Sequence, residues 1–139
     1  MAQQVRDVMT PDPVVVAPQT LVIDVARRMR SQDIGAVLVV EEGRLRGLVT
    51  DRDLVVRILA EGGAVADRTV GEACSEELLT VAPDDGLDRA IALAADRAVR
   101  RLPVVENNEP VGIVSLGDLA VERDPDSTLG QVSAAQPNE

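Results

Sequence analysis

The feature of this sequence that most constrains its fold is an internal repeat. Residues 5–55 and 70–120 align without a gap at a constant offset of 65 residues. The match is clearest between 47–54, which reads Gly-Leu-Val-Thr-Asp-Arg-Asp-Leu, and 112–119, which reads Gly-Ile-Val-Ser-Leu-Gly-Asp-Leu. Such self-similarity is typical of two copies of one structural unit packed together. A pair of similar units also creates a cleft in which a ligand can bind.

The length and the apolar residue types limit how these copies can be stabilised. The chain has 139 residues, which is the size of one domain. Units of roughly 55 residues bury too little surface to be stable alone, so we expect the two copies to share one core. Because Phe, Tyr and Trp are absent, that core must consist of Val, Leu, Ile and Ala.

Missing residue types exclude several functions. The sequence has no His and no Lys, which excludes histidine acid–base catalysis, Schiff-base chemistry and a P-loop lysine. A lone cysteine, Cys74, cannot form an internal disulfide or a cysteine-rich zinc site, and we interpret it as a small core residue in preference to a redox group. The net charge of −10 and the lack of aromatic side chains disfavour nucleic-acid binding. With no signal peptide and no apolar run near the ~20 residues that span a bilayer, we expect a cytoplasmic protein without membrane contact.

Hydrophobic spacing predicts the same order of elements in both copies: a helical turn, a short strand, a helix, two paired strands and a final helix. In the first copy these lie near 5–9, 14–16, 21–32, 36–40, 45–49 and 51–60. In the second copy they lie near 70–74, 79–81, 86–97, 101–105, 110–114 and 116–122. Helix caps are expected at Thr20, Thr50, Thr69 with Glu72, Asp84 or Asp85, and Ser115. The buried face of the first long helix is expected at Val22, Val25, Ala26 and Met29.

This pattern divides the chain into two units of β-α-β-β-α order, in the α/β (α+β) class. We predict a first unit at 4–60, a connector at 61–68, a second unit at 69–122 and a disordered tail at 123–139.

Four features together resemble a known family. They are Met9-Thr10 followed by 14–18, the segment 34–37 leading into Val39-Val40, the segment 99–105, and two Gly-x-x-Thr/Ser-x-x-Asp motifs. The chain is similar to a tandem pair of CBS domains, the cystathionine-β-synthase-type or Bateman module. The resemblance covers about residues 4–122 and implies two units related by pseudo-two-fold symmetry. We expect a stand-alone module, without an attached catalytic or transport domain.

What the resemblance implies is binding of an adenosine nucleotide, such as AMP, ADP or ATP, between the two units. The carboxylate at Asp53 or Asp118 is expected to accept hydrogen bonds from the ribose diol. The hydroxyl at Thr50 or Ser115 is expected near the ribose or first phosphate. Aliphatic residues and backbone are expected to enclose the adenine, at Val14, Ala36 and Val37 in one copy and Leu79, Leu102 and Pro103 in the other.

Elementary chemistry agrees with this assignment without requiring it. An ionised carboxylate suits a diol, and a helix N-terminus suits a phosphate. Thr50-x-x-Asp53 and Ser115-x-x-Asp118 are equally capping boxes with a purely structural role. The candidate side chains for binding the phosphate of the nucleotide are Arg100, Arg101 and Arg52.

The two copies offer unequal sites. Gly35-Ala36 stands in the first copy where the second has Arg100-Arg101, and successive strand residues point to opposite faces, so we expect one of the two arginines at the ligand. Gly117 replaces Arg52 in the second motif. An arginine held on a strand is better placed than one flanked by Asp51 and Asp53, so we predict one dominant nucleotide per chain, on Asp118.

Two functions of different classes remain open at this point. The first is a non-catalytic regulatory module that binds an adenosine nucleotide and passes a shape change to an unidentified protein partner or across a dimer. The alternative is a structural or interaction module that binds no nucleotide. A metal-dependent enzyme has little support, because the carboxylates at 51, 53 and 118 lack Ca²⁺-loop spacing.

The segment 54–59 is apolar around most of its circumference, which predicts a homodimer through the helices that follow the two motifs.

Overall fold

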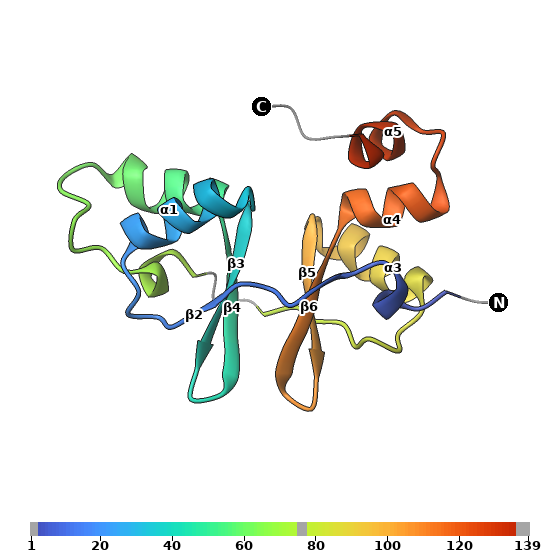
Figure 1. Ribbon diagram of the computed structural model, residues 1–139, viewed down its shortest axis with the longest axis horizontal. Coiled ribbons are helices and arrows are strands. Elements are labelled where there is room, and N and C mark those ends of the chain that lie inside the picture. Colours follow the sequence, from blue (N-terminus) through green and yellow to red (C-terminus); the bar gives the residue numbers. More distant parts are fainter. Residues whose placement is uncertain (1–2, 75–77, 136–139) are drawn as a thin grey trace. The chain divides into compact units, whose positions relative to one another are not determined.

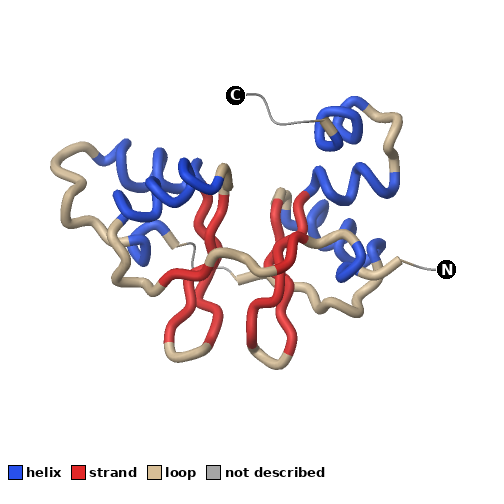
Figure 2. The backbone as a smooth tube through the Cα atoms, in the orientation of Figure 1, coloured by secondary structure: helices blue, strands red, loops and turns tan. Residues whose placement is uncertain are grey.

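The computed structural model describes residues 3–74 and 78–135. The chain divides into two units. The first, here called the Thr50 unit, comprises Pro13–Leu78 with Asn108–Pro110. The second, the Ser115 unit, comprises Met1–Asp12, Leu79–Asn107 and Val111–Glu139. Each unit combines a small sheet with helices, which confirms the mixed α/β class (Figures 1 and 2).

The sheet of the Thr50 unit has the order β2-β3-β4. Strand β2 is parallel to β3, and β3 is antiparallel to β4. Strand β3 is buried from Ala36 to Val39, as expected for a strand covered on both faces. The elements of this unit are β2 (Val15–Val16), α1 (Val22–Gln32), β3 (Ala36–Glu41), β4 (Arg44–Thr50), α2 (Asp51–Asp53), the π-helix η2 (Leu54–Ile58), and the 3-10 helices η3 (Leu59–Glu61) and η4 (Val70–Ala73).

The sheet of the Ser115 unit has the order β1-β6-β5. Strand β1 is antiparallel to β6, with Thr10 opposite Ile113, and the sequence patterns did not predict it. The elements of this unit are the 3-10 helix η1 (Val5–Asp7), β1 (Thr10–Pro11), α3 (Leu87–Arg97), β5 (Arg101–Glu106), β6 (Glu109–Ser115), α4 (Leu116–Arg123) and α5 (Thr128–Ala134).

Both hairpins turn on two residues with positive φ, which matches the twist of the flanking strands. Glu42 and Gly43 have φ of 52° and 76°, and Asn107 and Asn108 have φ of 54° and 67°. Both turns lie between the paired strands that the sequence predicts.

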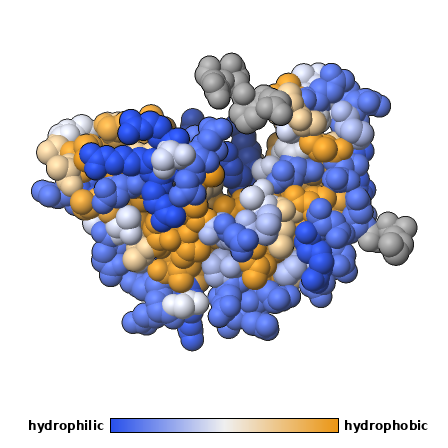
Figure 3. All heavy atoms as spheres, viewed as in Figure 1, coloured by the Kyte–Doolittle hydropathy of each residue, from blue (hydrophilic) through white to orange (hydrophobic). Residues whose placement is uncertain are grey.

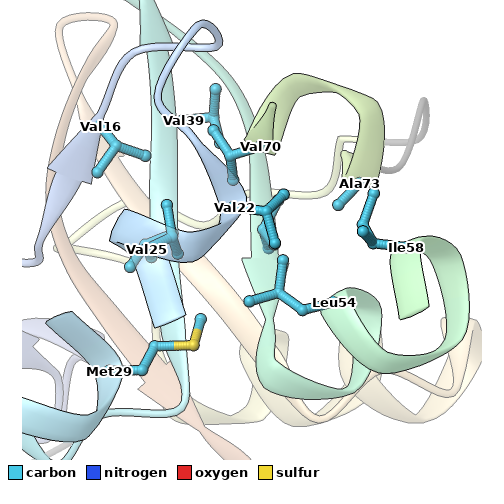
Figure 4. Close-up of a cluster of buried hydrophobic side chains, with 11 residues drawn as sticks. Val16, Val22, Val25, Met29, Val39, Leu54, Ile58, Val70 and Ala73 are labelled. Carbon is cyan, nitrogen blue, oxygen red and sulfur yellow. The ribbon is translucent and has the colours of Figure 1, made fainter. Parts of the chain in front are cut away.

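The first helical turn of each copy, η1 or η4, is here called its lead-in. Each lead-in packs in the unit that is built mainly from the other copy. Val5 of η1 is 0% exposed within a cluster that includes Leu87 and Leu102. Val70 of η4 is also 0% exposed, within the cluster of the Thr50 unit, where Figure 4 shows it near Val22. Residues 5–7 and 70–73 thus lie in the opposite units from those in which the predicted bounds 4–60 and 69–122 place them. Buried side chains of the described residues form two clusters, one in each unit.

The predicted cap of α1 is wrong. Leu21 and not Thr20 occupies the N-cap position, and no side chain caps the helix. The first free N–H, on Val22, donates instead to the carbonyl of Arg68 at 2.9 Å, while the carbonyl of Thr20 accepts from Val70 N–H at 2.8 Å. The segment just before η4 therefore supplies the acceptor that a capping side chain otherwise provides.

The start of α3 departs from expectation in the same way. Its N-cap is Gly86 and not Asp84 or Asp85, and Gly86 forms a bridge with Gln4. The Asp85 side chain turns back to accept from Ala82 N–H at 2.8 Å. The strand predicted at 79–81 is reduced to a single bridge between Val81 and Val104.

Two further expectations need correction. Ala26, predicted to be buried, is exposed, whereas Val22, Val25 and Met29 are buried as expected. Within the predicted disordered tail, residues 128–134 form α5, which Ser127 caps by accepting from Gly130 N–H at 3.0 Å. Helix α5 packs along α4 (Figure 1).

Candidate functional site

The Ser115 motif forms a complete capping box where β6 ends and α4 begins. Ser115 Oγ accepts from the backbone N–H of Asp118 at 3.0 Å, and Asp118 Oδ2 accepts from the N–H of Ser115 at 2.9 Å. The side chains of both residues are half-buried. Among the hydrogen bonds and ion pairs of the described residues, none uses Asp118 Oδ1. This motif therefore keeps one carboxylate oxygen available to a ligand while the other holds the helix start.

The Thr50 motif repeats the box with one difference. Thr50 Oγ1 accepts from Asp53 N–H at 3.1 Å, and Asp53 Oδ2 accepts from Thr50 N–H at 2.8 Å. Here the second oxygen, Asp53 Oδ1, lies 3.5 Å from Nε of Arg57, one helical turn on. The residue that matches Arg57 in the second copy is Glu122, which cannot form such a pair. The two motifs are therefore chemically unequal, and Asp118 is the less engaged carboxylate.

The predicted phosphate-binding arginines fall near these helix starts. The carbonyl of Arg100 accepts from the N–H of Leu116 at 2.8 Å, so its backbone adjoins the first turn of α4. In the other copy the carbonyl of Gly35 accepts from Asp51 N–H at 3.0 Å. Arg100 and Arg52 are exposed and Arg101 is half-buried. No ion pair within 3–74 and 78–135 uses any of these three guanidinium groups, so they can engage an anion.

The predicted adenine-enclosing residues differ in how much surface they offer. Val37 is 0% and Leu102 is 1% exposed, so their side chains belong to the two cores, and only their backbone could meet a ligand. Pro103 and Ala36 are also buried, and the carbonyl of Pro103 accepts from Val81 N–H at 3.1 Å. The half-buried members of the set are Val14 and Leu79.

The sequence reasoning missed one neighbour of the Ser115 motif, which is the C-terminal helix. A Cβ placed on Gly117 would lie 2.5 Å from Oγ of Ser133 in α5 and 3.6 Å from Oγ of Ser115. Ser133 therefore sits against the first turn of α4. The signals that could have revealed it are the Ser127 cap and the glycine that replaces Arg52.

Neither a reactive cysteine nor a metal-binding cluster is found among the described residues. Cys74 is half-buried against the core of the Thr50 unit, and its burial raises the pKa of the thiol, opposed by the charge of Arg46. A thiol with a raised pKa is a poor nucleophile at neutral pH. Across the described ranges, no group of three or more His, Cys, Asp or Glu side chains is placed to hold a metal ion. In the same ranges, no helix combines the length and the apolarity needed to cross a membrane.

Comparison with known proteins decides the family. The sequence matches the CBS domain twice, over residues 5–60 and 70–123. The chain belongs to the CBS-domain family. It is 40% identical over 126 residues to the CBS domain-containing protein YhcV of Bacillus subtilis, covering 91% of this chain and 89% of YhcV.

Solved structures of CBS proteins share its fold. The complex of CBSX2 with AMP is 25% identical with a TM-score of 0.74, covering 87% of this chain and 98% of CBSX2. The hexameric CBS-CP12 protein from bloom-forming cyanobacteria is 26% identical with a TM-score of 0.79, covering 90% of this chain and 74% of that one. The resemblance drawn from the motifs is thereby confirmed, and the chain is a CBS-pair regulatory module.

Proposed function

We propose that this CBS pair binds an adenosine nucleotide on the Ser115 motif and has no catalytic activity of its own. The observation that carries the proposal is the half-buried Asp118 carboxylate, which has one oxygen committed to the helix cap and one open. An open carboxylate oxygen at a helix N-terminus can accept from a ribose hydroxyl, and the positive end of the helix dipole favours a phosphate nearby. The AMP complex of the related CBSX2 supports the ligand class.

The unengaged arginines beside this motif support the same ligand. A phosphate approaching a chain of net charge −10 needs local positive charge. Arg100 and Arg101 supply it beside α4, and Asp53 is already paired with Arg57 in the other motif. We therefore propose one dominant nucleotide per chain, with the Thr50 motif as the weaker site.

Calorimetric titration with AMP tests this assignment on the wild type and two matched variants, Asp118→Asn and Asp53→Asn. An amide oxygen can still accept the capping hydrogen bond, but the charge that strengthens the bond to a ribose hydroxyl is lost. Losing a charged partner costs roughly 1.5–3 kcal/mol, or about 10- to 100-fold in affinity, so Asp118→Asn should bind AMP that much more weakly. Asp53→Asn should retain the dominant site.

Thermal unfolding of both variants provides the control, because a cap that survives leaves the melting temperature nearly unchanged. Equal AMP binding by the wild type and the Asp53→Asn/Asp118→Asn double variant would show that these residues are caps only. If AMP, ADP, ATP, S-adenosylmethionine and NAD all leave the melting temperature of the wild type unchanged, the alternative function as a structural or interaction module is correct.

We also propose that the module is a homodimer in the cytoplasm, through the helix that follows the Thr50 motif. Val55, Val56 and Leu59 are 53%, 44% and 57% exposed, which leaves an apolar strip along η2 and η3. Burying such a strip against a second copy is favourable at about 25 cal/mol per Å². Light scattering at tens of micromolar should give a dimer mass, and Val55→Glu should give a monomer. A wild-type monomer, or a hexamer like that of CBS-CP12, contradicts the proposal.

A further inference from the structure

We propose that α5 is an autoinhibitory segment that competes with the anionic group of the ligand for the first turn of α4. The inference rests on the proposed function, because it assigns a regulator to the same Ser115 site. It starts from the contact between Ser133 and Gly117, which brings the end of α5 over the motif. Helix α5 runs back along α4, so its C-terminal end lies at the N-terminal end of α4 (Figure 1).

Helix α5 can pack against the first turn of α4 because residue 117 is a glycine. Its virtual Cβ would lie 2.5 Å from Ser133 Oγ and 3.1 Å from Ser133 Cβ, which is closer than side chains pack. The matching residue of the first copy is Arg52, whose side chain would occupy that space. Only the second copy therefore has room for α5, and this copy also carries Asp118, the carboxylate with one oxygen open.

The far end of α5 is fixed by a tight turn. Ser127 Oγ donates to the carbonyl of Asp124 at 2.7 Å and caps the helix at Gly130 N–H. Gly130 is buried, and a Cβ there would lie 2.5 Å from the carbonyl oxygen of Asp124 and 3.0 Å from Cα of Pro125. The position of α5 over the site thus depends on a glycine at the opposite end of the helix from Ser133.

Helix dipoles make this arrangement competitive with an anion. The N-terminal N–H groups of α4 carry partial positive charge, and the C-terminal carbonyls of α5 carry partial negative charge. No basic residue lies in the last turn of α5 to offset that charge. A phosphate at the start of α4 would therefore meet both the bulk of Ser133 and the negative end of α5.

Helix α5 is suited to detach and return. It has 7 residues, fewer than an isolated helix needs to be stable in water. Leu129 is 42% and Val132 is 67% exposed, so little apolar surface holds it in place, and Figure 3 shows apolar atoms at the surface in this region. Short surface helices whose apolar side chains are partly exposed open at low free-energy cost.

The test compares AMP binding to the full chain and to two alanine variants by calorimetry. Gly130→Ala places a Cβ against the Asp124 carbonyl and should unseat α5 without touching Ser115 or Asp118. The matched control is Gly86→Ala, in the same unit, where an added Cβ meets no atom within 4 Å. Removing the opposing helix end should tighten AMP binding roughly 2- to 5-fold in Gly130→Ala, and Gly86→Ala should match the wild type.

Hydrogen exchange with and without AMP gives a second readout on the unmodified chain. Competition predicts faster exchange in 128–134 and slower exchange in 115–118 when AMP is bound. Unchanged affinity in Gly130→Ala, or α5 amides that become more protected with AMP, would overturn the autoinhibitory role while leaving the site intact. Failure of AMP to bind either the wild type or Gly130→Ala would overturn the proposed function itself.

Discussion

Truncating Val5 should destabilise the Ser115 unit, although Val5 lies in the first copy of the repeat. Val5 is 0% exposed among the side chains of that unit, and its N–H donates to the carbonyl of Asp85 at 2.8 Å. Val5→Ala removes two methyl groups at about 0.8 kcal/mol each and leaves a small cavity, so we expect a loss of about 2 kcal/mol. At ~1.4 kcal/mol per decade, this corresponds to roughly 30-fold faster exchange of protected amides.

Hydrogen exchange followed by mass spectrometry locates the effect. Val5→Ala should accelerate exchange in α3, β5 and β6 more than in α1, β3 and β4. The matched variant is Val70→Ala, at the equivalent position of the repeat and equally buried in the Thr50 unit, which should give the reverse pattern. If Val5→Ala instead accelerates exchange mainly in α1 and β3, each lead-in packs with its own copy and the reasoning is refuted.

Two other predictions concern backbone strain and pH. Ala98 caps α3 at φ 53°, in the left-handed region, so Ala98→Gly should raise the free energy of unfolding by roughly 1 kcal/mol in urea titrations, whereas Ala95→Gly, inside the helix, should lower it by about the same amount. Equal effects of the two would contradict the strain argument. The hydrogen bond from the backbone of Thr69, followed by that from Arg68, lowers the pKa of Glu72 in the folded state. A lowered pKa contributes stability above the unfolded value of about 4.3 and loses it as pH falls through the folded value. The loss of unfolding free energy in Glu72→Gln, measured by urea unfolding, should therefore be largest near pH 7 and become smaller as the pH falls. A loss that becomes larger at acid pH would mean that the pKa of Glu72 is raised in the folded state.

Features that depend on a few neighbouring residues could be predicted from the sequence. Thr50 and Ser115 cap their helices because hydroxyl and carboxylate stand three residues apart, which is sufficient to form a capping box. The hairpin at Asn107-Asn108 forms because asparagine tolerates positive φ. The same short patterns carried the family resemblance and the inequality of the two motifs.

Features that depend on distant partners could not be predicted. Thr20 is a good capping residue, yet α1 begins later because the carbonyl of Arg68 satisfies Val22 N–H. The sequence of α5 has only a weak helical pattern, and the helix packs on α4 at a place where Gly117 has no side chain to block it.

By itself, the sequence determined that two similar units exist, which residues begin their motif helices, and that their cores are aliphatic. Only the tertiary structure decided which lead-in packs in which unit. Val5 and Val70 are the same residue at equivalent positions of the repeat, so either fits either core by size and polarity. Local preferences carry no information on that choice. It is decided by the contacts each lead-in makes, Gln4 with Gly86 and Leu21 with Thr69, which exist only once the chain has folded.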